Sequence, residues 1–119
     1  MKTLVQKFGG TSVGSIENLE RVISIIKDLK SESEPLFVVC SAFGGVTDQL
    51  IGAATIACTA DQSYEQDIIA IKDRHIEVVE HFIPENVDVR IHIEESFDKI
   101  SSLLKGVFLL GQLPDKLLM

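Results

Sequence analysis

The residues with the clearest chemical potential form one short stretch near the start of the chain, Lys7-Phe8-Gly9-Gly10-Thr11-Ser12. Glycines allow a backbone to approach a ligand closely, and the free N–H groups at the start of a helix attract anions. Lys7 adds a positive charge before the glycines, and Thr11 and Ser12 add hydroxyl groups after them. The stretch therefore predicts a phosphate site at a strand-to-helix turn, which we name the first glycine turn (residues 9–14).

A plain strand-to-helix turn is the alternative interpretation, in which Lys7 is solvated and the glycines serve only the backbone conformation. Two common nucleotide motifs do not fit. In the Walker A loop the lysine follows the glycines, and Gly9, Gly10 and Gly14 do not give the dinucleotide fingerprint G-x-G-x-x-G. The complete string at a strand–helix junction nevertheless favours the phosphate site over the plain turn.

A second glycine turn (residues 41–47, Ser-Ala-Phe-Gly-Gly-Val-Thr) follows the next apolar run. That run, residues 36–40, is continuous, as in a strand buried on both faces of a parallel sheet. Because ligands of open α/β sheets bind beyond the carboxyl ends of the strands, we expect the two turns to converge on one crevice. Thr47 has two compatible interpretations, an N-cap of the next helix and a substrate contact.

The remaining pattern predicts the elements that position these turns. Strands are expected at residues 3–8 and 36–40, and helices at about 15–30, 47–60, 64–83 and 87–108. Ser15 is the expected N-cap of the first helix, with Asn18 at the capping-box position. Pro84-Glu85-Asn86 separates the last two helices, which predicts an antiparallel hairpin. Gly111 is expected to end that hairpin and Pro114 to open another helix.

Apolar periodicity also predicts which side of the hairpin is buried. In the first hairpin helix the expected inward residues are Ile68, Ile69, Ile76, Val79, Phe82 and Ile83. In the second they are Ile93, Phe97, Ile100, Leu104 and Val107, a coiled-coil-like seam.

Composition excludes several classes of protein. The 119 residues carry a formal net charge of −7, which disfavours a nucleic-acid partner or an anionic membrane. No apolar run is long enough for a membrane span, and a cytoplasmic location is expected. Cys40 and Cys58 are expected to be buried free thiols. His75, His81 and His92 lack metal-ligand spacing, so no metal site is predicted.

Only two strands are expected in the whole chain, and the apolar run of the second predicts that it is buried on both faces. A stable parallel sheet normally needs more strands. We therefore expect this chain to be the N-terminal portion of a longer protein.

From Lys7 to Gly14 the chain resembles the amino acid kinase family and, within it, the aspartate kinases; residues 38–50 and 104–111 are similar to them as well. The resemblance implies an α/β class of fold, the three-layer α/β/α amino acid kinase (carbamate kinase-like) fold. This chain would hold only its N-terminal portion. Residues 1–60 would form the βαβα part that binds substrate and phosphate, and residues 61–119 the helical hairpin.

The resemblance implies transfer of the γ-phosphoryl group of ATP to the side-chain carboxylate of L-aspartate, giving 4-phospho-L-aspartate, a first step toward lysine, threonine and methionine. ATP and the Mg²⁺ carried with it are the implied cofactors. Lys7 would be catalytic, and Ser41 and Thr47 would hold the aspartate. The nucleotide would be bound by Lys7, Phe8, Gly9, Gly10 and Ser12. Phe43-Gly44-Gly45 is one of several variants at the second turn, so the contacts there stay open.

Later family motifs that bind the substrate carboxylate and the adenine fall outside this chain, so the chain alone is expected to be inactive. Two alternatives stay open. One is another kinase of the same fold, acting on acetylglutamate, glutamate, carbamate or a nucleotide. The other is a non-catalytic assembly module. A homo-oligomer is expected in the full-length protein, and whether a regulatory domain or a fused homoserine dehydrogenase follows is left undecided.

Overall fold

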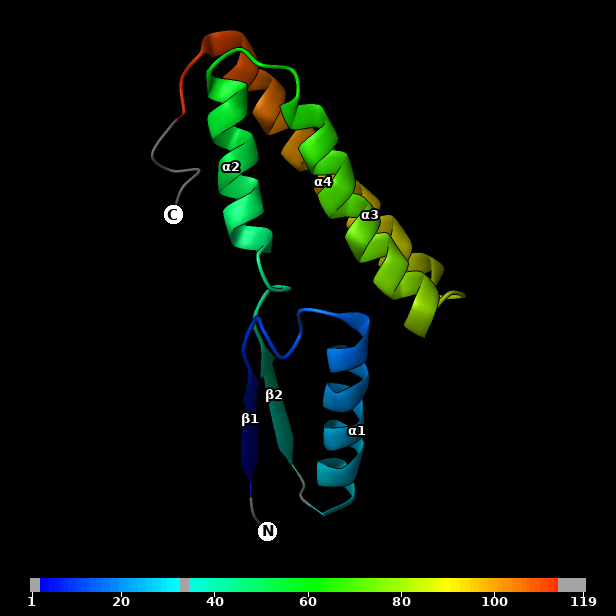
Figure 1. The fold of residues 1–119 in the computed structure, drawn as a ribbon. Helices are drawn as coiled ribbons and strands as arrows, with labels where there is room; N and C mark the ends of the chain where they lie inside the picture. Colours follow the sequence, from blue (N-terminus) through cyan, green and yellow to red (C-terminus); the bar gives the residue numbers. More distant parts are fainter. Residues whose placement is uncertain (1–2, 33–34, 114–119) are drawn as a thin grey trace. The chain divides into compact units, whose positions relative to one another are not determined.

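The structure is a computed structural model that describes residues 3–32 and 35–113. The chain divides after residue 47 into two compact units, and each is described by itself. The helix expected at Pro114 lies outside the described residues. The elements in chain order (Figure 1) are β1 (Leu4–Phe8), α1 (Ile16–Glu32), β2 (Leu36–Cys40), α2 (Val46–Cys58), α3 (Tyr64–Phe82) and α4 (Val87–Leu110).

The first unit is a β1–α1–β2 arrangement whose two strands are parallel (Figure 1). Their register pairs Leu4 with Leu36 at one end and Phe8 with Cys40 at the other. The helix α1 begins as predicted, because the Ser15 hydroxyl accepts a hydrogen bond of 3.1 Å from the backbone N–H of Asn18. Both strands and the helix were thus predicted correctly, with boundaries shifted by one or two residues.

Side chains in β1 alternate between the face covered by α1 and the open face. Phe8 is buried and joins Val13 and Val22 in a small core. The residues that pack around this core are Leu19, Ile26 and Phe43. Lys7 and Val5 are exposed on the alternate positions of the strand, so they belong to the open face.

The strand β2 is not buried on both faces, and that prediction is wrong. The side chains of Phe37 and Val39 are 55% and 50% exposed. In the part of the chain that the structure describes, the sheet has two strands, and α1 is the element that packs on it. Cys40 is correspondingly exposed and Cys58 half-buried, so both are free thiols as expected but neither is fully buried.

The second unit contains the predicted antiparallel hairpin of α3 and α4 (Figure 1). Tyr64 at the start of α3 lies against Phe108 near the end of α4, with ring centroids 5.8 Å apart. At the opposite end, the guanidinium of Arg90 forms a 2.8 Å ion pair with Glu80. Pairs at both ends of the two helices establish that they run in opposite directions.

Both ends of α4 are capped, and of these the end at Gly111 was expected from the sequence. The side-chain oxygen of Asn86 accepts a 3.0 Å hydrogen bond from the Val89 N–H, and Gly111 ends the helix in the left-handed conformation with φ +66°. The α4 seam is buried or half-buried as predicted. In α3, however, Ile69 is exposed and Ile71 is buried, and Ile83, which directly follows the helix, is exposed as well. The stripe of α3 follows 64, 68, 71 and 79, and Ile69 lies about 100° away from Ile68 around the helix.

Helix α2 begins at Val46, so Thr47 lies within its first turn and the N-cap interpretation of Thr47 is wrong. The preceding Gly45 has φ +84°, a conformation that glycine adopts without strain. Ala54 and Ala57 of this helix are buried. Among the described residues, no helix combines the length and the apolarity that crossing a bilayer requires.

Candidate functional site

The two glycine turns meet at the carboxyl ends of β1 and β2. The sheet pattern continues one residue past the strands, because the Ser41 N–H donates a 2.9 Å hydrogen bond to the Phe8 carbonyl. This bond holds the first residue of the second turn beside the last residue before the first turn. The convergence expected from the sequence is therefore present within the first unit.

Backbone atoms of the two turns are in direct contact. A Cβ atom placed on Gly44 would lie 2.9 Å from the carbonyl oxygen of Gly10 and 3.6 Å from the Cα of Gly14. A Cβ placed on Gly10 would lie 3.5 Å from the Cα of Gly44. Gly44 therefore has a structural reason to be glycine, since the turns approach more closely than a side chain allows.

Gly9 differs from the other glycines of the two turns. A Cβ placed on Gly9 would meet no protein atom within 4 Å, and Gly9 is not among the residues with positive φ. Neither packing nor backbone conformation requires glycine at this position. The backbone of Gly9 is open, which is the property that close approach by a ligand needs.

Lys7 is exposed on the open face of β1, immediately before this open backbone. Within the described residues it forms no ion pair. Its ammonium group is therefore available to a ligand at the strand end. Phe8, in contrast, is a buried core residue, so its side chain is engaged in packing and its backbone is the part that borders the turn.

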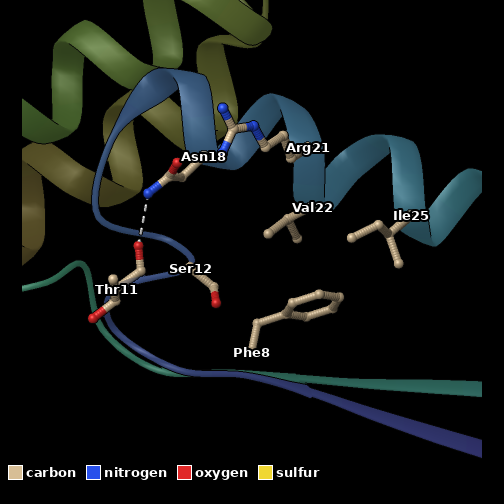
Figure 2. Close-up of a pocket in the computed structure, with 7 residues that line it drawn as sticks. All are labelled: Phe8, Thr11, Ser12, Asn18, Arg21, Val22 and Ile25. Atoms are coloured by element: carbon tan, nitrogen blue, oxygen red, sulfur yellow. Dashed lines mark hydrogen bonds between the residues drawn. The ribbon is translucent and has the colours of Figure 1, made fainter.

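A cavity of about 290 Å³ lies on the other side of the first turn, between β1 and α1 (Figure 2). Its polar wall contains the hydroxyl-bearing Thr11 and Ser12 together with Asn18 and Arg21. Its apolar residues are Phe8, Val22 and Ile25. Lys7 does not line this cavity, since it belongs to the opposite face of the strand. The predicted residues Lys7 and Ser12 thus border the same turn from different sides.

Asn18 has a second role that the sequence analysis missed. Its side-chain amide donates a 2.9 Å hydrogen bond to the Thr11 carbonyl, drawn as the dashed line in Figure 2. The position of Asn18 in the sequence could have indicated this bond, because the side chain at the capping-box position points back toward the backbone that precedes the helix. Here the Asn18 side chain reaches Thr11, which lies in the turn. Arg21 is exposed and also lines the cavity.

The two predicted aspartate contacts, Ser41 and Thr47, lie at the two ends of the second turn. Both residues are exposed, and neither hydroxyl forms a hydrogen bond with another described residue. Ser41 lies next to β1 through its backbone, and Thr47 is in the first turn of α2. All the predicted site residues therefore belong to the first unit.

The histidines lie elsewhere and pack as ordinary side chains. The His75 ring is half-buried, lies 5.3 Å from the Phe97 ring, and places Nδ1 2.8 Å from the Ile71 carbonyl oxygen. His81 and His92 are exposed. Across residues 3–32 and 35–113, no three His, Cys, Asp or Glu side chains are grouped as metal ligands would be.

Comparison with known proteins identifies the family. The model of the amino acid kinase family matches residues 2–112, and the chain therefore belongs to that family. The chain is 47% identical over 62 residues to an aspartate kinase of Pseudomonas fluorescens, an alignment that covers 52% of this chain and 15% of that protein. It is 32% identical over 114 residues to aspartokinase 1, chloroplastic, of Arabidopsis thaliana, covering 93% of this chain and 19% of that protein.

A third relative is a bifunctional aspartokinase/homoserine dehydrogenase, chloroplastic, of Daucus carota. It is 30% identical over 109 residues, which cover 90% of this chain and 12% of that protein. The resemblance to aspartate kinases is confirmed by these matches. The chain spans less than one-fifth of the length of each of these three relatives.

Proposed function

We propose that this chain is the N-terminal part of an aspartate kinase, which transfers the γ-phosphoryl group of ATP to the side-chain carboxylate of L-aspartate. The general kinase assignment follows from family membership and from the aspartokinase relatives. The particular substrate and the roles of individual residues are the proposed part. The observation that carries the proposal is the open backbone of Gly9 beside the unpaired ammonium of Lys7.

Lys7, Gly9 and Gly10 would bind the phosphate groups at the end of β1. The backbone N–H groups supply hydrogen bonds, and the lysine supplies a charge that offsets the negative charge of the transferring group. Because Gly9 carries no side chain and has open space before it, a phosphate can approach its backbone. Ser12 would approach the phosphate chain from the α1 side of the turn.

Ser41 and Thr47 would hold the aspartate, since their free hydroxyls lie on the turn that packs against the phosphate turn. Phosphoryl transfer requires positioning and charge stabilisation more than a covalent nucleophile. The aspartate carboxylate is ionised at neutral pH and attacks directly, so the site needs no general base. A set of lysine, glycines and hydroxyls is consistent with that chemistry.

Mg²⁺ would reach the site with the nucleotide. Mg²⁺ usually keeps several waters and is held by substrate phosphates with one or two protein carboxylates, rather than by a cage built of protein groups alone. When bound, the ion would neutralise part of the phosphate charge. The residues of this chain would then act on the phosphate groups and on the aspartate rather than on the ion.

The remaining ligand contacts, and the elements that cover the open face of β1 and β2, would come from the part of the protein represented in the longer relatives. This includes the full three-layer α/β/α fold, of which the described residues form one small parallel sheet and its helices. On this proposal the chain alone is inactive.

The test is an acyl-phosphate assay on the complete polypeptide with MgATP and a panel of acids: aspartate, glutamate, acetylglutamate and carbamate. Hydroxylamine traps an acyl phosphate as a hydroxamate. We expect hydroxamate with aspartate and none with the other acids. A signal with another acid alone would contradict the substrate assignment, and silence across the panel from folded protein would favour the assembly-module alternative.

A further inference from the structure

The hydrogen bond between Asn18 and Thr11 connects the first turn of α1 to the peptide that precedes Ser12. The Thr11 carbonyl accepts two hydrogen bonds, one of 3.2 Å from the Gly14 N–H and one of 2.9 Å from the Asn18 amide. The first lies within the turn itself. The second connects the turn to the helix through the Asn18 side chain, and Figure 2 shows it at the polar wall of the cavity.

Asn18 is itself held in place from the other direction. Its backbone N–H donates to the Ser15 hydroxyl at 3.1 Å, and the Leu19 N–H donates to the Ser15 carbonyl at 2.9 Å. These bonds fix the first turn of α1, which in turn packs through Val22 on Phe8. A rigid helix end therefore carries the amide that orients the Thr11–Ser12 peptide.

We propose that Asn18 is a positioning residue for nucleotide phosphate, acting through the Thr11–Ser12 peptide of the first glycine turn. This inference rests on the proposed function. The hydroxyls of Thr11 and Ser12 and the neighbouring Gly10 backbone belong to one short segment, so the orientation of the Thr11 carbonyl sets the directions of the groups around it. Without the Asn18 amide this peptide can rotate. The backbone and hydroxyl groups of the turn would then no longer point toward the phosphate.

The hydrogen bond from Asn18 lies on the phosphate turn and not on the turn assigned to aspartate. Its loss should therefore change the KM for MgATP more than the KM for aspartate. We expect Asn18→Ala in the complete enzyme to raise the KM for MgATP about three- to tenfold, the effect of losing one orienting hydrogen bond. The KM for aspartate stays within about twofold of the wild-type value, because Ser41 and Thr47 are not attached to Asn18.

A purely structural role predicts a different result. It would lower the amount of folded enzyme and reduce the apparent kcat, while leaving the KM for MgATP unchanged. Alanine has a higher helix propensity than asparagine, which offsets the lost bond, so Asn18→Ala is expected to keep a near-wild-type melting temperature. Asn18→Asp is the second variant. It cannot donate to the carbonyl, and an acidic residue suits the first turn of a helix, so it retains the fold and also raises the KM for MgATP.

The matched control is Asn86→Ala. Asn86 also uses its side chain in one hydrogen bond to backbone near a helix start, with the Val89 N–H at 3.0 Å, but it lies in the second unit. This variant is expected to lower the melting temperature and to leave both KM values unchanged. An unchanged KM for MgATP in both Asn18 variants, with active wild-type enzyme, overturns the role of Asn18 alone. A wild-type enzyme that forms no aspartyl hydroxamate overturns the proposed function instead.

Discussion

The carbonyl oxygen of Gly10 lies only 2.9 Å from the position that a Cβ atom on Gly44 would occupy. The two residues are 34 positions apart (44 − 10), and each belongs to a turn that ends one strand of the parallel pair. The contact fixes the distance between the proposed phosphate turn and the proposed aspartate turn. This distance matters because phosphoryl transfer depends on how closely the two substrates are aligned.

Gly44→Ala should therefore push the two turns apart. The added methyl meets backbone atoms, which cannot rotate away as a flexible side chain would, and we expect a loss of about 1–3 kcal/mol of stability. Urea unfolding of the variant and of the wild type measures this difference in stability. The control is Gly106→Ala in the interior of α4, where a Cβ meets no atom within 4 Å, and a gain of about 1 kcal/mol is expected from helix propensity. Equal stability of the two variants would contradict the close contact.

Gly9→Ala tests a different property of the same turn. The structure has open space at this position and no positive φ, so folding stability should stay within about 1 kcal/mol of wild type. The methyl group would nevertheless occupy the space through which a phosphate reaches the backbone. We expect the KM for MgATP to rise about tenfold or more. Wild-type kinetics in Gly9→Ala would show that no ligand approaches this peptide.

The second unit has a pH dependence that its single tyrosine should report. Burial raises the pKa of the Tyr64 hydroxyl, and the nearby negative charge of Glu65 adds to that rise. The folded state therefore keeps this proton to higher pH than the unfolded state, whose phenol titrates near pH ~10. The stabilising contribution is complete below that pH and is lost as the pH rises through the folded pKa.

Two measurements check this expectation. Tyr64 is the single tyrosine of the chain, so ultraviolet absorbance of the phenolate follows its titration directly. The midpoint should lie above that of the urea-unfolded chain. Urea unfolding of wild type and Tyr64→Phe should show a steeper loss of stability above pH ~10 in the wild type. Identical midpoints in folded and unfolded protein would contradict the burial effect.

Much of the local structure followed from the sequence. Ser15 is a polar N-cap before an apolar stripe, and Gly111 follows the last stripe, so the start of α1 and the end of α4 could be placed from residue type alone. The meeting of the two glycine turns was also predictable. Parallel strands place their carboxyl ends at one edge of a sheet, and the turns directly follow those ends.

Other features depend on which elements pack against one another, and the type of a residue does not determine this. The apolar run of β2 indicated burial on both faces, but burial requires covering elements, and within the described residues one face has none. Ile69 and Ile71 are the same residue type two positions apart, and the direction toward the neighbouring helices decides which of them is buried. The bond from Asn18 to Thr11 likewise depends on the exact path of the turn.

The most direct test of the account is the role of Lys7. Lys7→Ala in the complete enzyme should lower the kcat for aspartyl hydroxamate formation by about a hundredfold or more, as loss of a transition-state charge contact does. Lys27→Ala is the matched control, because Lys27 is an exposed lysine on α1 of the same unit, and its kcat should be unchanged. A folded Lys7→Ala enzyme with the wild-type kcat would contradict the assignment of this strand end as the site of phosphoryl transfer.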